Sequence, residues 1–490
     1  MEKMNQPTLM QALFAVGSLL ILVVYGLMLR PLLFGQAAFP LEIVFIAAAV
    51  IAISQLFYLG FSWLSIQQAI TNKLSQALPT ILLLFAIGLL IGSWLISGTI
   101  PMLVYYALKI VSPDHIYIIA FIVPIFFSLC TGTSWGSIAT IGLVLITVAH
   151  VIDANLGIVT GAIVGGAYFG DKMSPLSDTT NIAAMAAKVE LYQHIKSMQY
   201  TTIPSALLAA ICFVALDYIY PAQLDLASSA VNDIALFEQT LLAIDSLFKF
   251  NFLLLLPPFI ILYGSIKQQP PLPILMLSSL VACLLALIFQ SIEVDDVVQT
   301  LYKGFDISMV NASVVNSEGS LIVLPEIINT LFNRGGLYAL NEPIIITILV
   351  FIYVGALDCI AAMPTLVNQL LKGIKRKSSL ICTTLFSSAM TNAMTSSQYA
   401  NSFIVGEAFG DKYDQLDVSR KVLSRSLEDT GTMIESLVPW STTAVFIYAS
   451  LGVAIEDYWH WQLLSLINIP IAFGCAMMGI GCFYTKKIEN

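Results

Sequence analysis

The feature that most constrains this chain is a series of long apolar runs that contain almost no charged side chains. The run from 271 to 290, for example, is free of Asp, Glu, Lys and Arg. About 20 consecutive apolar residues let an α-helix cross the hydrocarbon core of a bilayer. Ten such runs lie at roughly 9–29, 40–63, 79–98, 155–187, 200–220, 251–266, 271–290, 343–366, 429–455 and 460–484, and two further stretches, 116–150 and 379–410, are broken near their middles by small polar residues.

The composition excludes a water-soluble protein. Hydrophobic residues make up 58% of the 490 residues and charged residues only 10%, whereas typical soluble proteins carry about 25% charged residues. Such a chain would expose large apolar patches to water. We therefore predict an all-α polytopic membrane protein whose surroundings are the lipid bilayer, and we expect neither a soluble enzyme nor a partner nucleic acid.

The sequence contains no motif for a resident metal or cofactor. The seven cysteines form no C-x-x-C pair and the four histidines are scattered, so the cysteines are expected to be small buried hydrophobes. No G-x-x-x-x-G-K-S/T loop occurs, hence we expect no ATP-driven motor in this chain. No small-residue cleavage site follows the run 9–29, which is therefore expected to be a span and not a signal peptide.

The distribution of Lys and Arg predicts the orientation, because these residues gather in cytoplasmic loops. The segments 221–249 and 291–342 are acidic and poor in base. Ten crossings of the inner (cytoplasmic) membrane, with both termini in the cytoplasm, place every basic loop on the cytoplasmic side and both acidic segments on the outside. This count requires that 116–150 and 379–410 are re-entrant hairpins. The basic residues used for this prediction are Lys188, Lys196, Lys267, Lys372, Lys375, Arg376, Lys377, Lys486 and Lys487.

This topology makes the two halves of the chain inverted copies, since the first hairpin opens from outside and the second from inside. A weak sequence repeat agrees with it: Thr133-Ser134 precedes a P-x-S-x-T motif at Pro175, and Thr395-Ser396 precedes another at Pro439. Inverted-topology repeats with re-entrant hairpins and discontinuous helices are typical of secondary transporters. The predicted parts are 1–111 (scaffold helices), 112–199 (first hairpin and broken helix), 200–366 (central helices with an acidic external loop), 367–455 (second hairpin and broken helix) and 456–490 (last helix and tail).

The first broken stretch carries two acids, Asp171 and Asp178, within an apolar run. A charge at the bilayer centre costs roughly 2.5–3.5 kcal/mol on insertion scales, so each acid needs a partner, water or an ion. Pro175 interrupts the helix and frees carbonyl oxygens. The hydroxyls of Ser177, Thr179 and Thr180 complete the kind of oxygen shell that a hard cation prefers. The alternative is that Asp171 pairs with Lys172 at a membrane edge and that the hydroxyls only satisfy a kink.

The second broken stretch carries Glu435, four residues before Pro439, with Ser441 and Thr442 after it. Its first acids, Glu428 and Asp429, are expected to begin the crossing, where they could simply interact with a helix N-terminus. Asp358 is a further intramembrane acid without an obvious partner in the sequence, and structural and relay roles are both open for it.

Small polar residues mark the tips of the two hairpins. They allow the chain to turn within the membrane, and the sequence leaves open whether they also touch a substrate. The tip candidates are Thr133, Ser134, Asn392, Thr395 and Ser396. The G-x-x-x-G patterns at Gly161–Gly165 and Gly166–Gly170 predict close helix packing.

Three segments resemble the NhaC family of Na+/H+ antiporters. The family's signature resembles the run at 166–180, G-A-Y-F-G-D-K-M-S-P-L-S-D-T-T. A second family landmark resembles L-S-R-S-L-E-D-x-G-T at 423–432 together with V-P-W at 438–440. A third family motif resembles N-R-G-G at 333–336. The likeness covers about residues 80–455. It implies an ion-transporter superfamily fold, usually dimeric, that exchanges Na+ for H+ or is an exchanger of the malate-proton/sodium-lactate type.

Our sequence-based hypothesis places competition between Na+ and H+ at one partly desolvated carboxylate, Asp178, helped by Ser177, Thr179 and oxygens of the opposite broken helix. Alternating access moves this site between the two sides. The rival hypotheses are an exchanger of organic acids or amino acids coupled to Na+, a passive channel, and an intramembrane enzyme. The enzyme is disfavoured because no nucleophile–base pair or paired-aspartate motif is present.

Overall fold

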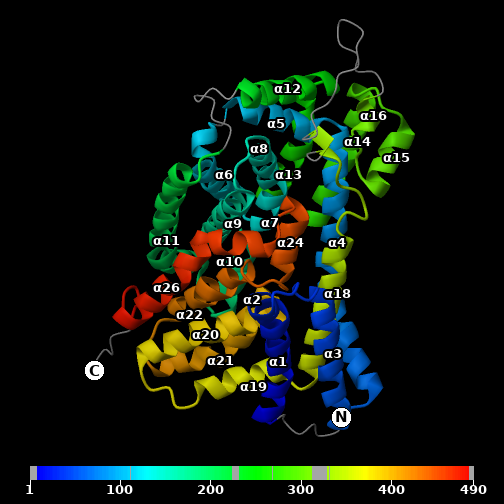
Figure 1. Ribbon diagram of the computed structural model, residues 1–490. Helices are drawn as coiled ribbons and strands as arrows, with labels where there is room; N and C mark the ends of the chain where they lie inside the picture. The colour runs from blue at the N-terminus through cyan, green and yellow to red at the C-terminus, as the bar shows by residue number, and fades with distance from the viewer. Residues whose placement is uncertain are drawn as a thin grey trace, which may run out of the picture.

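The computed structural model describes residues 8–110, 112–222, 231–267, 269–311, 328–329 and 332–484 (Figure 1). Within these ranges the chain is helical, and the extended pairing is limited to one isolated bridge between Val418 and Tyr484. Eight of the described helices are long and apolar enough to cross a membrane, or ten if each of two bent pairs is one span. The predicted all-α polytopic architecture is confirmed. Lys486 and Lys487 lie outside the described residues.

The spans differ in detail from those predicted. Both arms of the first hairpin, Pro113–Thr131 and Ser134–Val151, are long and apolar enough to count as spans, although the sequence analysis treats them as one re-entrant unit. The broken stretches 155–187 and 429–455 are not among the eight, since polar residues interrupt them.

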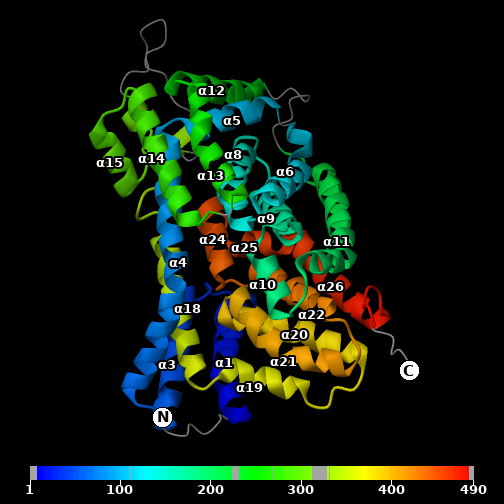
Figure 2. The same cartoon turned by 180° about the vertical axis from the view of Figure 1, so that it is seen from behind.

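One long helix, α4 (Trp63–Ile96), packs against α18 (Asn341–Cys359) and α14 (Pro271–Phe289) and extends along one side of the molecule (Figures 1 and 2). The prediction that this span starts at 79 is wrong: Ser62 caps the helix by accepting from the Ser65 N–H at 3.2 Å, and Pro79 lies in the helix interior. Proline is tolerated there because neighbouring helices in a membrane protein re-satisfy the backbone.

Asp358 does have a partner, which the sequence did not reveal. Its carboxylate lies 2.8 Å from the ammonium group of Lys73, so that an ion pair joins α18 to α4. This pairing within the scaffold supports a structural role for Asp358.

The first hairpin consists of α6 (Ile116–Thr131), α7 (Ser134–Ser137), a π-helical turn (Ile138–Gly142) and α8 (Leu143–Val151). The broken helix that follows consists of α9 (Leu156–Met173) and α10 (Asp178–Ala186). A Cβ atom added at Gly166 would lie 2.1 Å from the carbonyl oxygen of Phe121, and one at Gly161 would lie 2.3 Å from that of Trp461. The predicted close packing at the G-x-x-x-G patterns is confirmed.

The second hairpin consists of α20 (Lys377–Thr395) and α21 (Gln398–Gln415). Its broken helix runs through α22 (Arg420–Ser426), the π-helical segment η5 (Leu427–Thr432) and α23 (Met433–Glu435), and resumes as α24 (Thr442–Leu451). The expectation that Glu428 and Asp429 begin this crossing is wrong, because the helix starts at Arg420 and both acids lie buried in its interior. They therefore cannot act as partners of a helix N-terminus.

The remaining helices surround these units. Figures 1 and 2 show α5 and α12 lying across one end of the molecule and α20 and α21 near the other. These helices are α1 (Leu9–Val23), α2 (Arg30–Phe34), α3 (Leu41–Tyr58), α5 (Thr99–Ile110), α11 (Leu191–Ile219), α12 (Val231–Leu247), α13 (Leu256–Ile266), α15 (Val294–Lys303), α16 (Ser308–Asn311), α19 (Ala362–Leu371), α25 (Ile455–Tyr458) and α26 (Leu463–Met478).

Candidate functional site

Each hairpin tip turns through one left-handed residue. In the first hairpin this residue is Gly132, with φ of 69°, and in the second it is Ser396, with φ of 52°. The next residue then caps the following helix: the Thr133 hydroxyl accepts from the Gly136 N–H at 3.2 Å, and the Ser397 hydroxyl accepts from the Ala400 N–H at 3.2 Å. Thr133 therefore stabilises the turn.

Asp171, in the last turn of α9, is held by the first hairpin tip. One carboxylate oxygen, Oδ2, accepts from the backbone N–H of Ser134 at 3.1 Å and from its hydroxyl at 2.7 Å. The other oxygen, Oδ1, is buried and has no hydrogen-bond partner in the described part of the chain. The alternative that Asp171 pairs with Lys172 at a membrane edge is wrong, because Lys172 pairs elsewhere.

Glu435, at the end of α23, is held by the second hairpin tip in a similar way. Its Oε1 accepts from the side-chain amide of Asn392 at 3.0 Å, and its Oε2 accepts from the hydroxyl of Thr443 at 3.0 Å. Both carboxylate oxygens of Glu435 are therefore bonded, whereas Asp171 keeps one oxygen free.

The two halves use matching hydrogen bonds at matching positions. Asp171 and Glu435 each stand four residues before the proline of their broken helix. The hydroxyl of Ser128 donates to the carbonyl of Ala167 at 2.7 Å, and the amide of Asn392 donates to the carbonyl of Gly431 at 2.8 Å. These two carbonyls each lie eight residues before the same prolines.

The hydroxyls at the two helix breaks cap the helices that follow. Ser177 accepts from the Thr180 N–H at 3.3 Å, and Ser441 accepts from the Ala444 N–H at 2.9 Å. Thr180 in turn donates to the carbonyl of Lys172 at 3.2 Å.

Ser396 and Thr442, two of the predicted residues in the second half, connect the hairpin tip to the helix break through a hydrogen bond. The Thr442 N–H donates to the Ser396 hydroxyl at 2.8 Å. Among the described residues, the Thr395 hydroxyl donates to the carbonyl of Thr391 in its own helix and to that of Ser397. Ser396 and Thr442 thus lie at the meeting point of hairpin and break, and Thr395 stabilises the end of α20.

Asp178, the centre of the sequence-based hypothesis, lies at the exposed surface of the break. Its carboxylate accepts from the hydroxyl of Tyr399, which follows the second tip, and from the N–H of Thr179 at 2.9 Å. The expected partial desolvation of this side chain is not observed, because Asp178 is the first residue of α10 and is exposed. The Thr179 hydroxyl bonds that of Ser177 at 3.1 Å.

A buried ionic cluster joins the two broken helices. The Lys172 ammonium lies 2.5 Å from Oδ1 of Asp429, and this oxygen also accepts from Thr201 of α11 at 2.8 Å. Asn468 of α26 donates to the Asp429 carbonyl at 3.0 Å. The Arg425 Nε lies 3.6 Å from the second carboxylate oxygen of Asp429. Sequence reasoning missed this cluster, although Asn468, an amide in the middle of an apolar run, was a signal that could have pointed to it.

Glu428 is the third buried acid of this region. It is fully buried, its Oε2 accepts from Thr432 at 2.8 Å, and its Oε1 accepts from Gln398 at 3.4 Å. The two buried cations, Lys172 and Arg425, both face Asp429. Among the described residues, Asp171, Glu428 and Glu435 have no ionic partner. Asp171 and Glu428 are buried and Glu435 is half-buried, and burial of a carboxylate favours its neutralisation by a proton or a cation.

The oxygens around these acids suit a hard monovalent cation better than a transition metal. Within the described ranges no group of three or more His, Cys, Asp or Glu side chains could hold a metal ion. Hydroxyl, amide and backbone carbonyl oxygens dominate instead, and these are the ligands of hard cations. A cation at this place would be a transported substrate.

Two interrupted helices with acids beside the breaks, in a helical membrane protein, are typical of secondary transporters. The chain matches the Na+/H+ antiporter family over residues 166–480, and it belongs to this family. The resemblance to NhaC proteins is confirmed.

Three relatives illustrate the range of the family. An uncharacterised Na+/H+ antiporter of Haemophilus influenzae is 36% identical over 486 residues, 99% of each chain. The Na+/H+ antiporter NhaC of Alkalihalophilus pseudofirmus is 30% identical over 427 residues, 86% of this chain and 87% of the relative. The malate-2H+/Na+-lactate antiporter of Bacillus subtilis is 28% identical over 487 residues, 99% of this chain and 98% of the relative.

Proposed function

We propose that this chain is a secondary transporter that exchanges Na+ for H+ across the inner (cytoplasmic) membrane, with Asp171 and Glu435 as the carboxylates that take up Na+ and H+ in turn. The observation that carries the proposal is their equivalent placement: each acid precedes a helix break and faces a hairpin tip. Exchange of this kind is driven by ion gradients and needs neither a cofactor nor covalent chemistry, in keeping with a family of transporters and not of enzymes.

Asp171 is the better Na+ ligand of the two. Its buried Oδ1 has no other partner in the described chain, and an ionised oxygen in a low-dielectric site attracts a cation strongly. Glu435 already uses both oxygens for hydrogen bonds and is proposed to carry a second proton, while Na+ and H+ compete at Asp171. This assignment moves the centre of the site from Asp178 to Asp171, with Asp178 and Tyr399 on the exposed approach.

We also propose that the two halves are inverted repeats, with the part boundaries given by the sequence. The matching bonds of Ser128 and Asn392 support this proposal, because a shared ancestor motif would place equivalent donors against equivalent carbonyls. Alternating access would then move one hairpin and its broken helix against the scaffold. Cytoplasmic termini and a homodimer remain predictions of this proposal.

A second candidate function is exchange of an organic acid coupled to Na+ and H+. Arg334 favours it: the guanidinium donates to Thr147 of α8 at 2.8 Å, and its buried Nε has no partner in the described ranges. Burial lowers the pKa of Arg334 to about 10, so the side chain stays cationic at neutral pH. A cation beside the first hairpin could attract a carboxylate substrate.

The test is transport by the purified full-length protein in sealed liposomes with an internal pH dye. Na+ is added against an imposed proton gradient, first alone and then with malate, lactate or amino acids, for the wild type, Asp171→Asn and Arg334→Gln. We expect prompt Na+-dependent proton flux without any organic solute, lost in Asp171→Asn. Flux that needs an organic acid, and that Arg334→Gln abolishes, would replace simple Na+/H+ exchange by the second function.

A further inference from the structure

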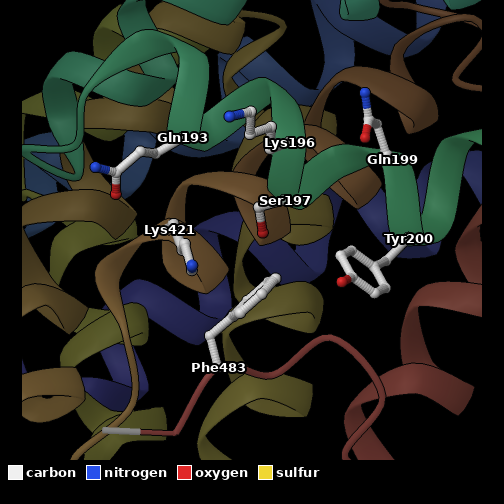
Figure 3. A pocket seen from close by; sticks show the side chains of 7 residues that line it. All are labelled: Gln193, Lys196, Ser197, Gln199, Tyr200, Lys421 and Phe483. Carbon is white, nitrogen blue, oxygen red and sulfur yellow. The ribbon is translucent and has the colours of Figure 1, made fainter.

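A pocket separate from the buried acids opens where α11, α22 and the C-terminal segment meet (Figure 3). Its volume is about 380 Å³. Figure 3 shows Lys421 of α22 beside the ring of Phe483, with side chains of α11 arranged along the opposite wall. The lining residues are Gln193, Lys196, Ser197, Gln199, Tyr200, Lys421 and Phe483.

The lining is suited to an anion. It contains two lysines, two amides, a hydroxyl and a phenol, and no acidic side chain. In the described part of the chain neither Lys196 nor Lys421 forms a salt bridge. The Lys421 ammonium instead lies 3.5 Å from the centroid of the Phe483 ring. Two unpaired ammonium groups with nearby amide and hydroxyl donors are the chemistry that recognises a phosphate.

The surroundings of the pocket favour a lipid as the source of that phosphate. From Tyr200, on the pocket wall, a stripe of side chains continues along one face of α11: Tyr200, Ile203, Leu207, Ile211 and Val214. These residues follow a helical spacing and are 40% to 64% exposed. In a membrane-spanning helix such a face contacts acyl chains, so the stripe leads from hydrocarbon directly to the basic pocket.

We propose that this pocket binds the headgroup of an anionic phospholipid whose acyl chains lie along the exposed face of α11. The headgroup phosphate is recognised by Lys196 and Lys421 at the rim, and the C-terminal segment closes one side through Phe483. Anionic lipids are attracted to such basic clusters at a membrane surface.

Arg425 connects this pocket to the buried ionic cluster around Asp429. Nη1 of Arg425 donates to the carbonyl of Gly481 in the C-terminal segment at 3.0 Å and to that of Ser197 on the pocket wall at 3.4 Å. The same guanidinium faces Asp429. Arg425 therefore links the wall of the pocket and the C-terminal segment to the buried Asp429.

The test is native mass spectrometry of the purified full-length protein with phosphatidylglycerol or phosphatidylcholine of the same acyl chains. We compare the wild type with Lys196→Gln/Lys421→Gln and with a matched control, Lys372→Gln/Lys375→Gln, which removes two exposed lysines of the basic loop. We expect the wild type and the control to prefer phosphatidylglycerol, and the pocket variant to bind it about tenfold more weakly or worse. The single variant Lys196→Gln, which keeps the Lys421–Phe483 contact, should show an intermediate loss.

Two results would overturn the proposal. Equal phosphatidylglycerol binding by the pocket variant and the control would show that the lysines do not recognise the headgroup. Displacement of the lipid by millimolar inorganic phosphate would identify a site for a soluble anion instead. Neither readout depends on Na+/H+ exchange, so the outcome is independent of the proposed transport function.

Discussion

The two broken helices place an acid at the same position but surround it differently. Asp171 keeps one oxygen free and lies on α9, a helix that packs backbone to backbone through Gly166. Glu435 has both oxygens bonded and lies on a helix that also carries Arg425, Glu428 and Asp429. The position equivalent to Gly166, nine residues before the second proline, is Thr430, whose hydroxyl donates to the carbonyl of Leu385 at 2.7 Å.

The two surroundings differ in how far they constrain the acid. In the first half Gly166 packs closely against the backbone of α6, and Ser134 donates two hydrogen bonds to one carboxylate oxygen of Asp171. In the second half, hydrogen bonds from Asn392 and Thr443 fix the Glu435 carboxylate, and the same broken helix carries the charged residues Arg425, Glu428 and Asp429. The buried pair Lys172–Asp429 then connects the sides, with Lys172 from the first and Asp429 from the second.

The largest expected effect is on this connection. Lys172→Met leaves Asp429 buried without its closest cation, and losing one partner of a buried ion pair typically destabilises a protein by about 3–5 kcal/mol. We expect a large drop in thermal stability in detergent and little transport. The double variant Lys172→Met/Asp429→Asn should recover much of the stability, because it removes both charges. Strictly additive losses in the two single variants and the double variant would show that the pair does not couple the halves.

The next prediction compares the two acids directly. Asp171→Asn should reduce Na+-dependent proton flux by about 100-fold, as expected when a charged ligand worth about 3 kcal/mol is lost. Glu435→Gln should reduce it less, by about tenfold, because a glutamine keeps an acceptor for Asn392. Flux assays in liposomes at Na+ concentrations well below the wild-type KM measure both losses, and normal thermal stability is the control for folding. Equal losses in both variants would mean that the free oxygen of Asp171 gives it no special role.

The backbone packing of the first half should also be sensitive. Gly166→Ala adds a Cβ that would meet the Phe121 carbonyl oxygen at 2.1 Å, and overpacking of this kind costs about 1–3 kcal/mol. Gly17 is a matched control, because a Cβ there would meet nothing within 4 Å. We expect a lower melting temperature for Gly166→Ala and an unchanged one for Gly17→Ala. A tolerated Gly166→Ala would contradict the description of the first half as packed through its backbone.

The pH dependence should report how many of the acids compete. Na+ binds the ionised carboxylate and H+ binds the same group, so protons must be released before Na+ can bind. The apparent KM for Na+ should therefore fall as pH rises, by at most about tenfold per pH unit for one competing proton and about 100-fold for two. Initial rates measured from acidic to alkaline pH give this slope. If two protons compete, Glu435→Gln should reduce the pH dependence of KM to that expected for one proton. A KM that does not change with pH would contradict competition at a shared carboxylate.

The sequence located the acids and the helix breaks but not the pairing of the buried charges. Hydropathy is a local pattern, so the spans, the two breaks and the acids beside Pro175 and Pro439 could be located from it. The contact between Lys172 and Asp429 joins residues 257 positions apart, and no local pattern indicates which buried charge meets which. The exposure of Asp178 was also hidden, because whether the first residue of a helix after a break faces inward depends on how the hairpins pack around it.

The smallest expected effect is that of Asp178→Asn. Asp178 is exposed and its visible role is to accept from Tyr399 across the two halves. Exposed polar interactions are weak, so we expect transport to fall by about threefold or less and the pH slope to stay the same. Tyr399→Phe, which removes the same hydrogen bond from the other side, should match it. If Asp178→Asn instead abolishes flux while Asp171→Asn does not, the ion binds at the exposed end of the break, and the contrast between Asp171 and Glu435 reflects packing rather than transport.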